Sequence, residues 1–191
     1  MARLYVCGRD AMPAHVRRLR PSCIVSLLPA EDQPPTPTSV LVINHLRLHF
    51  NDVEQRGEGA PRREHVESLI GFLRARPRAS VLLHCMAGIS RSTAAALVAL
   101  TVDAPGREIE AARLLRERGP HAYPNRLILE HADAILGRNG RLVAVRDEMS
   151  WMDYACSEPA LITLPRWSAA AARAGTARRT PARPLRRPPA A

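Results

Sequence analysis

The chain has 191 residues, of which 46% are hydrophobic and 4% aromatic, so we expect one domain with a core of Leu, Val, Ile and Ala. Its formal net charge is +10, and all 28 basic residues are arginine. Seven of them and no acid lie in residues 166–191, which leaves +3 for residues 1–165. The composition excludes a zinc ribbon, a disulfide scaffold, a secretory signal and a membrane span, and it predicts a cytoplasmic protein with free thiols.

Strand and loop patterns alternate in the first third of the chain. Residues 4–7 and the apolar run at residues 23–28 are expected to be strands. Residues 29–37 are rich in proline and predict a surface loop. Apolar and polar residues alternate toward the end of residues 39–50, which predicts the next strand. Two glycines and a proline then break the pattern over residues 51–61.

Helical patterns dominate the middle of the chain. A one-sided apolar stripe predicts a helix over residues 61–76, followed by a buried strand over residues 80–84. Further helices are expected over residues 92–102, 107–118 and 123–136, the last ending at a glycine suited to a C-terminal cap. Strands interleaved with helices predict an α/β fold, with a central mostly parallel sheet flanked by helices.

The pattern weakens beyond residue 140. LVAV and ALITLP are short apolar segments that we expect to lie against the domain, which would end at residue 165. Residues 166–191 consist mainly of Ala, Arg and Pro, and we expect them to be a disordered, solvated tail. Contact of this basic tail with an acidic partner, nucleic acid or an anionic membrane is the alternative. It lacks the interleaved aromatic residues and the amphipathic pattern that such contacts favour.

A cysteine at the end of a buried strand is the most unusual feature of the sequence. Residues 81–93 read VLLHCMAGISRST, in which Cys85 follows the predicted strand and Arg91 opens the next helix. In open α/β sheets, ligands bind at such strand-to-helix turns. The intervening residues are Met86, Ala87, Gly88, Ile89 and Ser90. Because glycine frees the backbone and the helix N-terminus adds a positive dipole, this loop is expected to bind phosphate.

Arg91 and Cys85 complement this loop chemically. A guanidinium group binds two phosphate oxygens at once, which Lys cannot do. The same positive field favours the thiolate of Cys85, the nucleophilic form. A departing alkoxide or phenolate needs a proton, and Asp52, placed after a strand at the same sheet edge, is the expected general acid. Glu54 and Glu58 in the same segment are its rivals.

These residues resemble a known family. HCMAGISRS matches the His-Cys-x5-Arg-Ser/Thr signature of the cysteine-based protein tyrosine phosphatases, and AGISRS is similar to their dual-specificity branch. This chain would be a small, bacterial-type member of that branch, and the resemblance covers residues 1–137. It implies hydrolysis of a phosphomonoester through a cysteinyl-phosphate intermediate, with neither a metal nor a cofactor.

The resemblance also implies a role for each matching residue. Cys85 would be the nucleophile, Arg91 would hold the phosphate, and the amides of residues 86–91 would surround it. His84 would help to hold the thiolate, and the Ser92 hydroxyl would assist breakdown of the intermediate. Two further residues match the branch. They are Asp52, 33 positions before Cys85, where an acid is expected, and Asn125 in Tyr123-Pro124-Asn125, where an Asn supports the loop.

The substrate is predicted from the middle of the loop. Residues 86–90 carry no charge, whereas loops that bind polyanions tend to contain Lys or His, so a singly phosphorylated protein is favoured. A phosphoinositide, an RNA 5′ end and a catalytically silent phosphate-binding module are the alternatives. Rhodanese-type sulfur transfer also uses a cysteine in such a loop, but it does not require an Arg-Ser pair after five residues.

Several of these residues also have purely structural interpretations. Cys85 could be an inert core thiol, His84 a core histidine and Asp52 a turn former. Cys7 and Cys23 are expected in the core, and a reversible disulfide of either with Cys85 is an alternative. His45 and His49 are expected on one face of a strand, but too far apart to share a metal.

Overall fold

In the computed structural model, which describes residues 2–148 and 159–167, five strands form one sheet in the order β3-β2-β4-β1-β5. The strands are β1 (Arg3–Gly8), β2 (Cys23–Leu28), β3 (His45–His49), β4 (Val81–Cys85) and β5 (Ile162–Pro165). Strands β1 to β4 run parallel, and β5 pairs antiparallel with β1. The predicted mostly parallel α/β fold is therefore confirmed.

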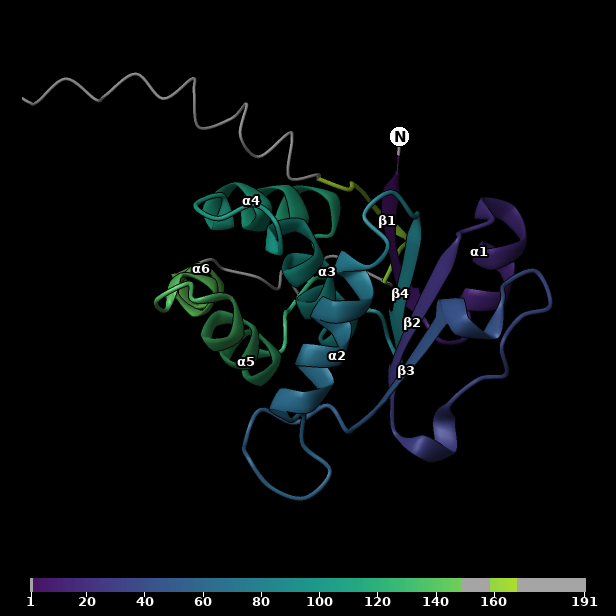
Figure 1. Ribbon diagram of the computed structural model, residues 1–191, viewed down its shortest axis with the longest axis horizontal. Coiled ribbons are helices and arrows are strands. Elements are labelled where there is room, and N and C mark those ends of the chain that lie inside the picture. The colour runs from purple at the N-terminus through teal and green to yellow at the C-terminus, as the bar shows by residue number, and fades with distance from the viewer. Residues whose placement is uncertain (1, 149–158, 168–191) are drawn as a thin grey trace, which may run out of the picture.

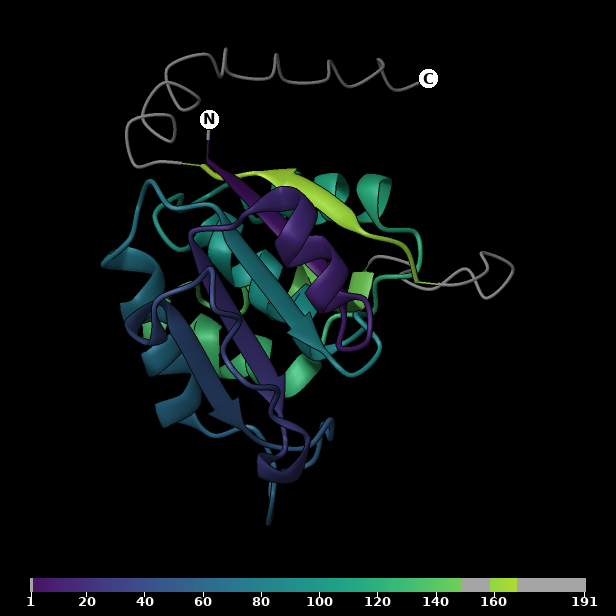
Figure 2. The same ribbon diagram turned by 90° about the vertical axis from the view of Figure 1, so that its right-hand side faces the viewer.

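The helices cover the two faces of the sheet unequally. They are α1 (Met12–Leu19), α2 (Arg63–Arg74), α3 (Arg91–Thr101), α4 (Glu108–Arg118), α5 (Arg126–Leu136) and α6 (Arg141–Glu148). Helix α1 lies on one face, and α2 to α6 lie on the other (Figure 1). Figure 2 looks onto the face that α1 covers. The carboxyl ends of the parallel strands all lie at the lower edge of Figure 1.

Helix α3 forms the centre of the core. All of its residues are buried, and it contacts β1, β4, α2, α4 and α5. Its Ala94, Ala95 and Ala96 let neighbouring elements approach closely, because alanine adds little volume. Helix α2 buries the predicted stripe of Val66, Leu69, Ile70 and Leu73 against this layer. These contacts hold the N-terminus of α3 at the end of β4.

Two local predictions were wrong. The strand expected over residues 39–50 is limited to β3, because Val42–Asn44 forms a 3-10 turn. Leu41, Val42 and Ile43 are 70–74% exposed, so this apolar run does not enter the sheet. Helix α1 was not predicted, since it buries only Met12 and Val16 and its remaining residues show no broad apolar stripe.

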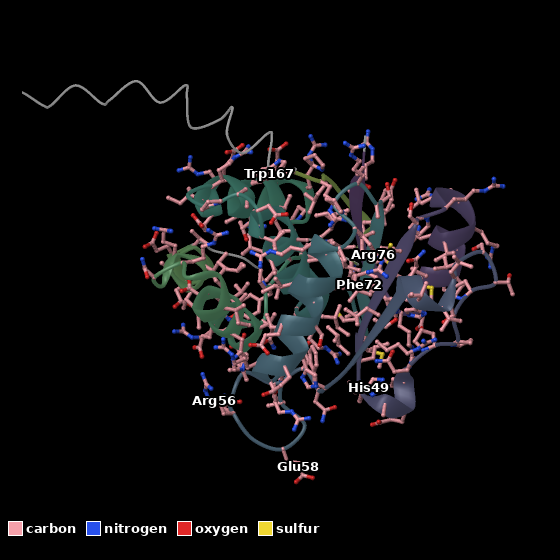
Figure 3. All side chains as sticks on the ribbon, in the orientation of Figure 1. His49, Arg56, Glu58, Phe72, Arg76 and Trp167 are labelled. Atoms are coloured by element: carbon pink, nitrogen blue, oxygen red, sulfur yellow. The ribbon has the colours of Figure 1, made fainter. Side chains whose placement is uncertain are left out.

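The chain after α6 returns to the domain. The LVAV segment lies in α6, and ALITLP contains β5. Arg166 donates hydrogen bonds to the carbonyl oxygens of Leu73 (2.6 Å) and Ala79 (2.9 Å). The guanidinium of Arg107 stacks over Trp167, 3.8 Å from the ring centre, at the upper edge of Figure 3. Residues 168–191, most of the predicted tail, lie outside the described residues.

Within residues 2–148 and 159–167, no helix is both long and apolar enough to cross a bilayer.

Candidate active site

The loop of residues 86–90 joins β4 to α3 at the carboxyl edge of the sheet. Cys85 ends β4 and is 1% exposed, so its sulfur lies at the base of the loop. The Gly88 N–H donates to Cys85 Sγ at 3.3 Å, and Ser92 Oγ lies 3.2 Å from the same sulfur. The sulfur is therefore held inside the loop by one backbone amide and one side-chain hydroxyl.

The loop curls against the end of β1, and Gly88 makes this possible. Its φ is +80°, in the left-handed region that favours glycine. A Cβ at this position would lie 2.7 Å from the Cys7 carbonyl carbon and from the Gly8 nitrogen. The Arg9 N–H also donates to the Met86 carbonyl at 3.0 Å. Strand β1 thus supports the loop, which the sequence pattern did not indicate.

Arg91 is the first residue of α3 and is almost completely buried. Its Nη1 donates to the Phe50 carbonyl at 3.1 Å, and its Nε lies 3.4 Å from Asp52 Oδ2. Its Nη2 makes no hydrogen bond to the described residues. The guanidinium is therefore held on one side and available to a ligand on the other.

Asp52 lies beside Arg91, as its position after β3 predicted. Its Oδ1 accepts hydrogen bonds from Ser90 Oγ (2.7 Å) and Asn125 Nδ2 (2.9 Å). Its side chain is 34% exposed, so solvent and a ligand can reach it. The structure thus brings Asp52, Arg91 and the loop together around Cys85.

The two rival acids of this segment lie elsewhere. Glu54 Oε1 accepts from the Arg126 N–H at 2.8 Å and from Arg146 Nη2 at 3.0 Å, at the start of α5. Glu58 lies at the outer tip of the segment and points away from the protein (Figure 3). This geometry favours Asp52 as the acid nearest the loop.

Asn125 is fully buried between the acid and the loop. Its Nδ2 donates to Asp52 Oδ1 and to the Val53 carbonyl (3.2 Å), and its Oδ1 accepts from the Ile128 N–H (3.1 Å). Its backbone N–H donates to the Ser90 carbonyl at 3.3 Å. One side chain therefore caps α5 and fixes the segment that carries Asp52.

His84 is fully buried behind the loop, on β4. Its Nε2 lies 2.6 Å from Ser26 Oγ, and that oxygen is 2.7 Å from His45 Nε2. Burial lowers the pKa of both His84 and His45 to about 4, so both rings are neutral at pH 7. Sequence reasoning missed Ser26 and His45 as partners of the site. The available signal was a polar residue within each of two apolar strands.

The structure places Cys7 and Cys23 away from this chemistry. The side chain of Cys7 packs in the core on the α1 face of the sheet, whereas Cys85 and Cys23 belong to the core on the opposite face. Burial, with a smaller effect of Cys85, raises the pKa of Cys7 to about 12. Cys7 is therefore a poor partner for a disulfide with Cys85. Within residues 2–148 and 159–167, no cluster of His, Cys, Asp and Glu is arranged to bind a metal.

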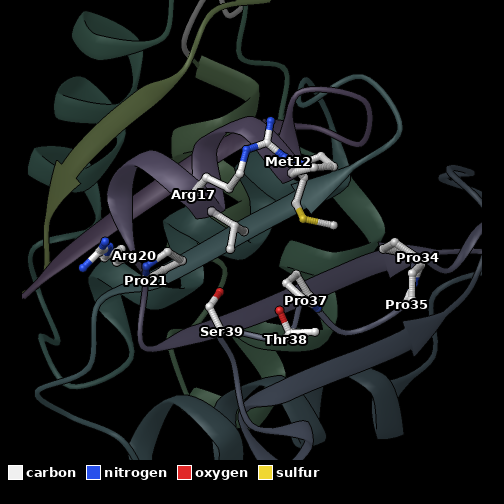
Figure 4. A pocket seen from close by; sticks show the side chains of 11 residues that line it. Met12, Arg17, Arg20, Pro21, Pro34, Pro35, Pro37, Thr38 and Ser39 are labelled. Atoms are coloured by element: carbon white, nitrogen blue, oxygen red, sulfur yellow. The ribbon is translucent and has the colours of Figure 1, made fainter.

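A groove lies on the other side of the sheet. It has a volume of about 780 Å³, runs between α1 and residues 34–39, and is lined by Met12, Val16 and five prolines, among other residues (Figure 4). Arg17 and Arg20 lie at its rim. Because Cys85, Arg91 and Asp52 do not line it, the groove is separate from the candidate active site.

Comparisons with known proteins identify the fold. No family model matches the sequence, and no curated protein is significantly similar to it. Among solved structures, DUSP15 aligns over 77% of this chain and 92% of its own, with a TM-score of 0.57 and 18% identity. The Yvh1 phosphatase domain from Chaetomium thermophilum aligns over 73% and 93%, with a TM-score of 0.56 and 20% identity.

A third structure, the human tyrosine phosphatase-like serine/threonine/tyrosine-interacting protein, aligns over 70% of this chain and 91% of its own. Its TM-score is 0.55 and its identity 17%. Identities at this level establish the fold and leave the activity to be argued from the site. The chain has the fold of the dual-specificity and related protein tyrosine phosphatases.

Proposed function

We propose that the protein is a phosphomonoester hydrolase that removes phosphate from tyrosine, and also from serine or threonine, in other proteins. One observation carries this proposal: the buried Cys85 sulfur accepts from the Gly88 N–H and contacts the Ser92 hydroxyl, inside a loop beside which Arg91 and Asp52 meet. A merely structural cysteine needs none of these groups. The arrangement suits a thiolate that attacks a bound phosphoryl group.

In the first step, the Cys85 thiolate attacks phosphorus. The S–P bond forms while the bond from phosphorus to the substrate oxygen breaks, and protonated Asp52 gives its proton to that oxygen. The free side of Arg91 and the amides of residues 86–91 bind the phosphoryl oxygens and stabilise their charge. The dephosphorylated hydroxyl then leaves, and Cys85 carries the phosphate.

In the second step, water attacks phosphorus. The Asp52 carboxylate takes a proton from this water as the new O–P bond forms and the S–P bond breaks. The electron pair of the broken bond returns to Cys85, and the Ser92 hydroxyl, 3.2 Å away, stabilises the sulfur as it leaves. Inorganic phosphate is released, and no metal or cofactor takes part in either step.

The cysteine dependence is tested with a simple aryl phosphate in the presence of a chelator. We expect hydrolysis by the wild-type protein and no measurable hydrolysis by Cys85→Ser. Brief exposure to substrate followed by acid quenching is expected to trap a phosphate on Cys85, seen by mass spectrometry. Wild-type activity in Cys85→Ser would refute the cysteine mechanism. An inactive wild-type protein would refute the proposed activity and leave a phosphate-binding module.

The role of Asp52 is tested by a matched pair of variants in one segment. Asp52→Asn is expected to lower kcat roughly 100-fold or more, because the leaving group loses its proton donor. Glu58→Gln makes the same chemical change at the exposed tip and is expected to keep wild-type kcat. Equal effects of the two variants would contradict the assignment of Asp52 as the general acid.

The substrate class follows from the uncharged loop and is tested with a panel. Phosphotyrosine, phosphoserine and phosphothreonine peptides are compared with inositol phosphates and triphosphorylated RNA by kcat/KM. We expect the phosphopeptides to be preferred, because residues 86–90 offer no cationic side chain to a second phosphate. A preference for the inositol phosphates or the RNA would overturn this choice.

A further inference from the structure

A buried chain of polar side chains crosses three strands behind the loop. Arg47 Nη2 donates to Thr36 Oγ1 at 2.7 Å, and Thr36 Oγ1 lies 3.0 Å from His45 Nδ1. His45 Nε2 lies 2.7 Å from Ser26 Oγ, which lies 2.6 Å from His84 Nε2. The chain therefore leads from a surface loop to the residue that precedes Cys85. We call these five side chains the relay.

Because both imidazoles of the relay are neutral, its hydrogen bonds can run in either of two opposite directions. Ser26 and His84 are fully buried and His45 nearly so, and both imidazoles are neutral at pH 7. A neutral imidazole carries one N–H, on either Nδ1 or Nε2, and the other nitrogen accepts. Each buried hydroxyl likewise has one proton to donate. The protons can therefore point along the relay in one of two directions.

Arg47 sets that direction, because a guanidinium can only donate. Thr36 Oγ1 accepts from Arg47, which leaves the Thr36 proton for His45 Nδ1. His45 then carries its own proton on Nε2 and donates to Ser26 Oγ. Ser26 donates in turn to His84 Nε2, so the His84 proton lies on Nδ1. In this arrangement each of the four contacts from Arg47 to His84 Nε2 has one donor and one acceptor.

The opposite direction leaves polar groups without partners. The Thr36 proton would then face no acceptor among the described residues, since Thr36 Oγ1 contacts only Arg47 and His45 there, and it would have to turn to solvent. At the other end, His84 Nδ1 is buried and has no hydrogen-bond partner of ordinary geometry among the described residues. Burial lowers the pKa of this ring, and the Cys85 backbone partly offsets that effect, as a carbonyl facing an Nδ1–H would. A lone pair on Nδ1 would instead oppose that carbonyl.

We propose that Thr36, His45 and Ser26 are positioning residues that hold His84 as its Nδ1–H tautomer and thereby orient the Cys85 backbone at the base of the loop. The consequence for catalysis rests on the proposed function, whereas the tautomer does not. Thr36 lies in the proline-rich loop between Pro35 and Pro37, which line the groove of Figure 4. Arg47 also donates to the Pro34 carbonyl at 3.2 Å, which anchors the outer end of the relay.

The tautomers are measured directly by long-range ¹H–¹⁵N correlation spectra of histidine-labelled protein at pH 7. We expect the Nδ1–H form for His84 and the Nε2–H form for His45. The reverse assignment of either ring, or a charged ring at pH 7, would overturn the proposal. This measurement requires no turnover.

A pair of substitutions at Thr36, near the outer end of the relay, tests whether its hydroxyl affects the tautomer of His84. Thr36→Val keeps the shape of the side chain and removes the hydroxyl, whereas Thr36→Ser keeps the hydroxyl. Thr36 is half-buried and touches neither Cys85 nor residues 86–90, so both variants are expected to fold. In Thr36→Val we expect His84 to lose its single Nδ1–H form, and in Thr36→Ser we expect the wild-type spectrum.

The effect on Cys85 is read from its alkylation by iodoacetamide as a function of pH, with the Cys85 peptide followed by mass spectrometry. In Thr36→Val we expect the midpoint to rise by about one pH unit, which is roughly ten-fold slower alkylation below that midpoint. Thr36→Ser is expected to restore the wild-type midpoint. An unchanged midpoint and an unchanged His84 spectrum in Thr36→Val would refute the relay.

The relay and the proposed phosphatase function can be refuted independently of each other. A wild-type protein that hydrolyses no phosphomonoester but shows the expected tautomers and the Thr36→Val shift would retain the relay and lose the proposed function. Active protein with the reverse tautomers would lose the relay alone.

Discussion

At the scale of a single residue, Gly88 decides the shape of the loop of residues 86–90. Its φ of +80° and the 2.7 Å approach of the Cys7 and Gly8 backbone together exclude any side chain. The same close approach allows the Gly88 N–H to donate to the Cys85 sulfur. One missing Cβ therefore determines both the path of the loop and a hydrogen bond to the nucleophile.

Gly88→Ala is expected to disable the site, and Gly106→Ala provides the matched control. Gly106 has a similar φ of +82°, but a Cβ there would meet nothing within 4 Å. Gly106→Ala should therefore lower the free energy of unfolding by about 1 kcal/mol through backbone strain alone and keep full activity. Gly88→Ala should lower it further, because backbone atoms must move, and abolish aryl phosphate hydrolysis. Urea unfolding and initial rates measure both, and equal effects would contradict this account.

The N-terminus of α5 organises the site at the scale of an element. Asn125 caps the helix with its carbonyl oxygen and holds Asp52 and Val53 with its amide group. Glu54 adds a second attachment by accepting from the first amide of the helix. The segment after β3 is thus fastened to α5, which comes some 70 residues later in the chain. A helix cap here has the additional effect of positioning the acid.

Substitutions of Asn125 separate these two effects. Asn125→Ser keeps an oxygen for the cap and loses the amide donors, whereas Asn125→Ala loses both. We expect both variants to lose the same factor in kcat, about ten-fold, because Asp52 is released in each. Asn125→Ala should also lose about 1 kcal/mol more in the free energy of unfolding. The rates on aryl phosphate and urea unfolding curves give the comparison. Wild-type kcat in Asn125→Ser would show that Asn125 does not position Asp52.

At the scale of the whole molecule, two buried histidines make the free energy of unfolding depend on pH. His45 and His84 lie inside the sheet and stay neutral because burial lowers the pKa of each to about 4. In the unfolded chain their pKa values return to about 6.5. Between these values the unfolded chain binds protons that the folded protein does not. The free energy of unfolding therefore increases as the pH rises from the folded to the unfolded pKa value. It decreases again as the pH is lowered through the same range.

We predict that lowering the pH from about 7 to about 5 reduces the free energy of unfolding by roughly 2 kcal/mol for each of these histidines. His45→Gln should show a smaller dependence on pH, since one of the two groups is absent. The comparison uses the slope against pH, so a constant loss of stability in the variant does not affect it. Urea unfolding at several pH values measures this slope, and identical slopes for the two proteins would contradict the assignment.

Much of the architecture could be predicted from local patterns. The apolar stripe of α2, the largely apolar β2 and the glycine that ends α5 each determine an element through neighbours in sequence. The apolar run at residues 41–43 misled this approach, because hydrophobicity alone does not distinguish a sheet interior from an exposed turn. Helix α1 was not predicted in this way, because its two buried residues, Met12 and Val16, form too weak an apolar stripe.

The sequence by itself determined the residues on which the proposed chemistry depends: a cysteine, a glycine and an arginine at fixed spacing, placed between a strand and a helix. That information is local, since seven consecutive residues from Cys85 to Arg91 carry it. Only the tertiary structure decided that Asp52 and not Glu54 lies beside Arg91, and that Ser26 and His45 connect Thr36 to His84. These pairings join segments that lie far apart in the chain. The order of strands and the packing of α5 bring them together, and neither can be obtained from spacing.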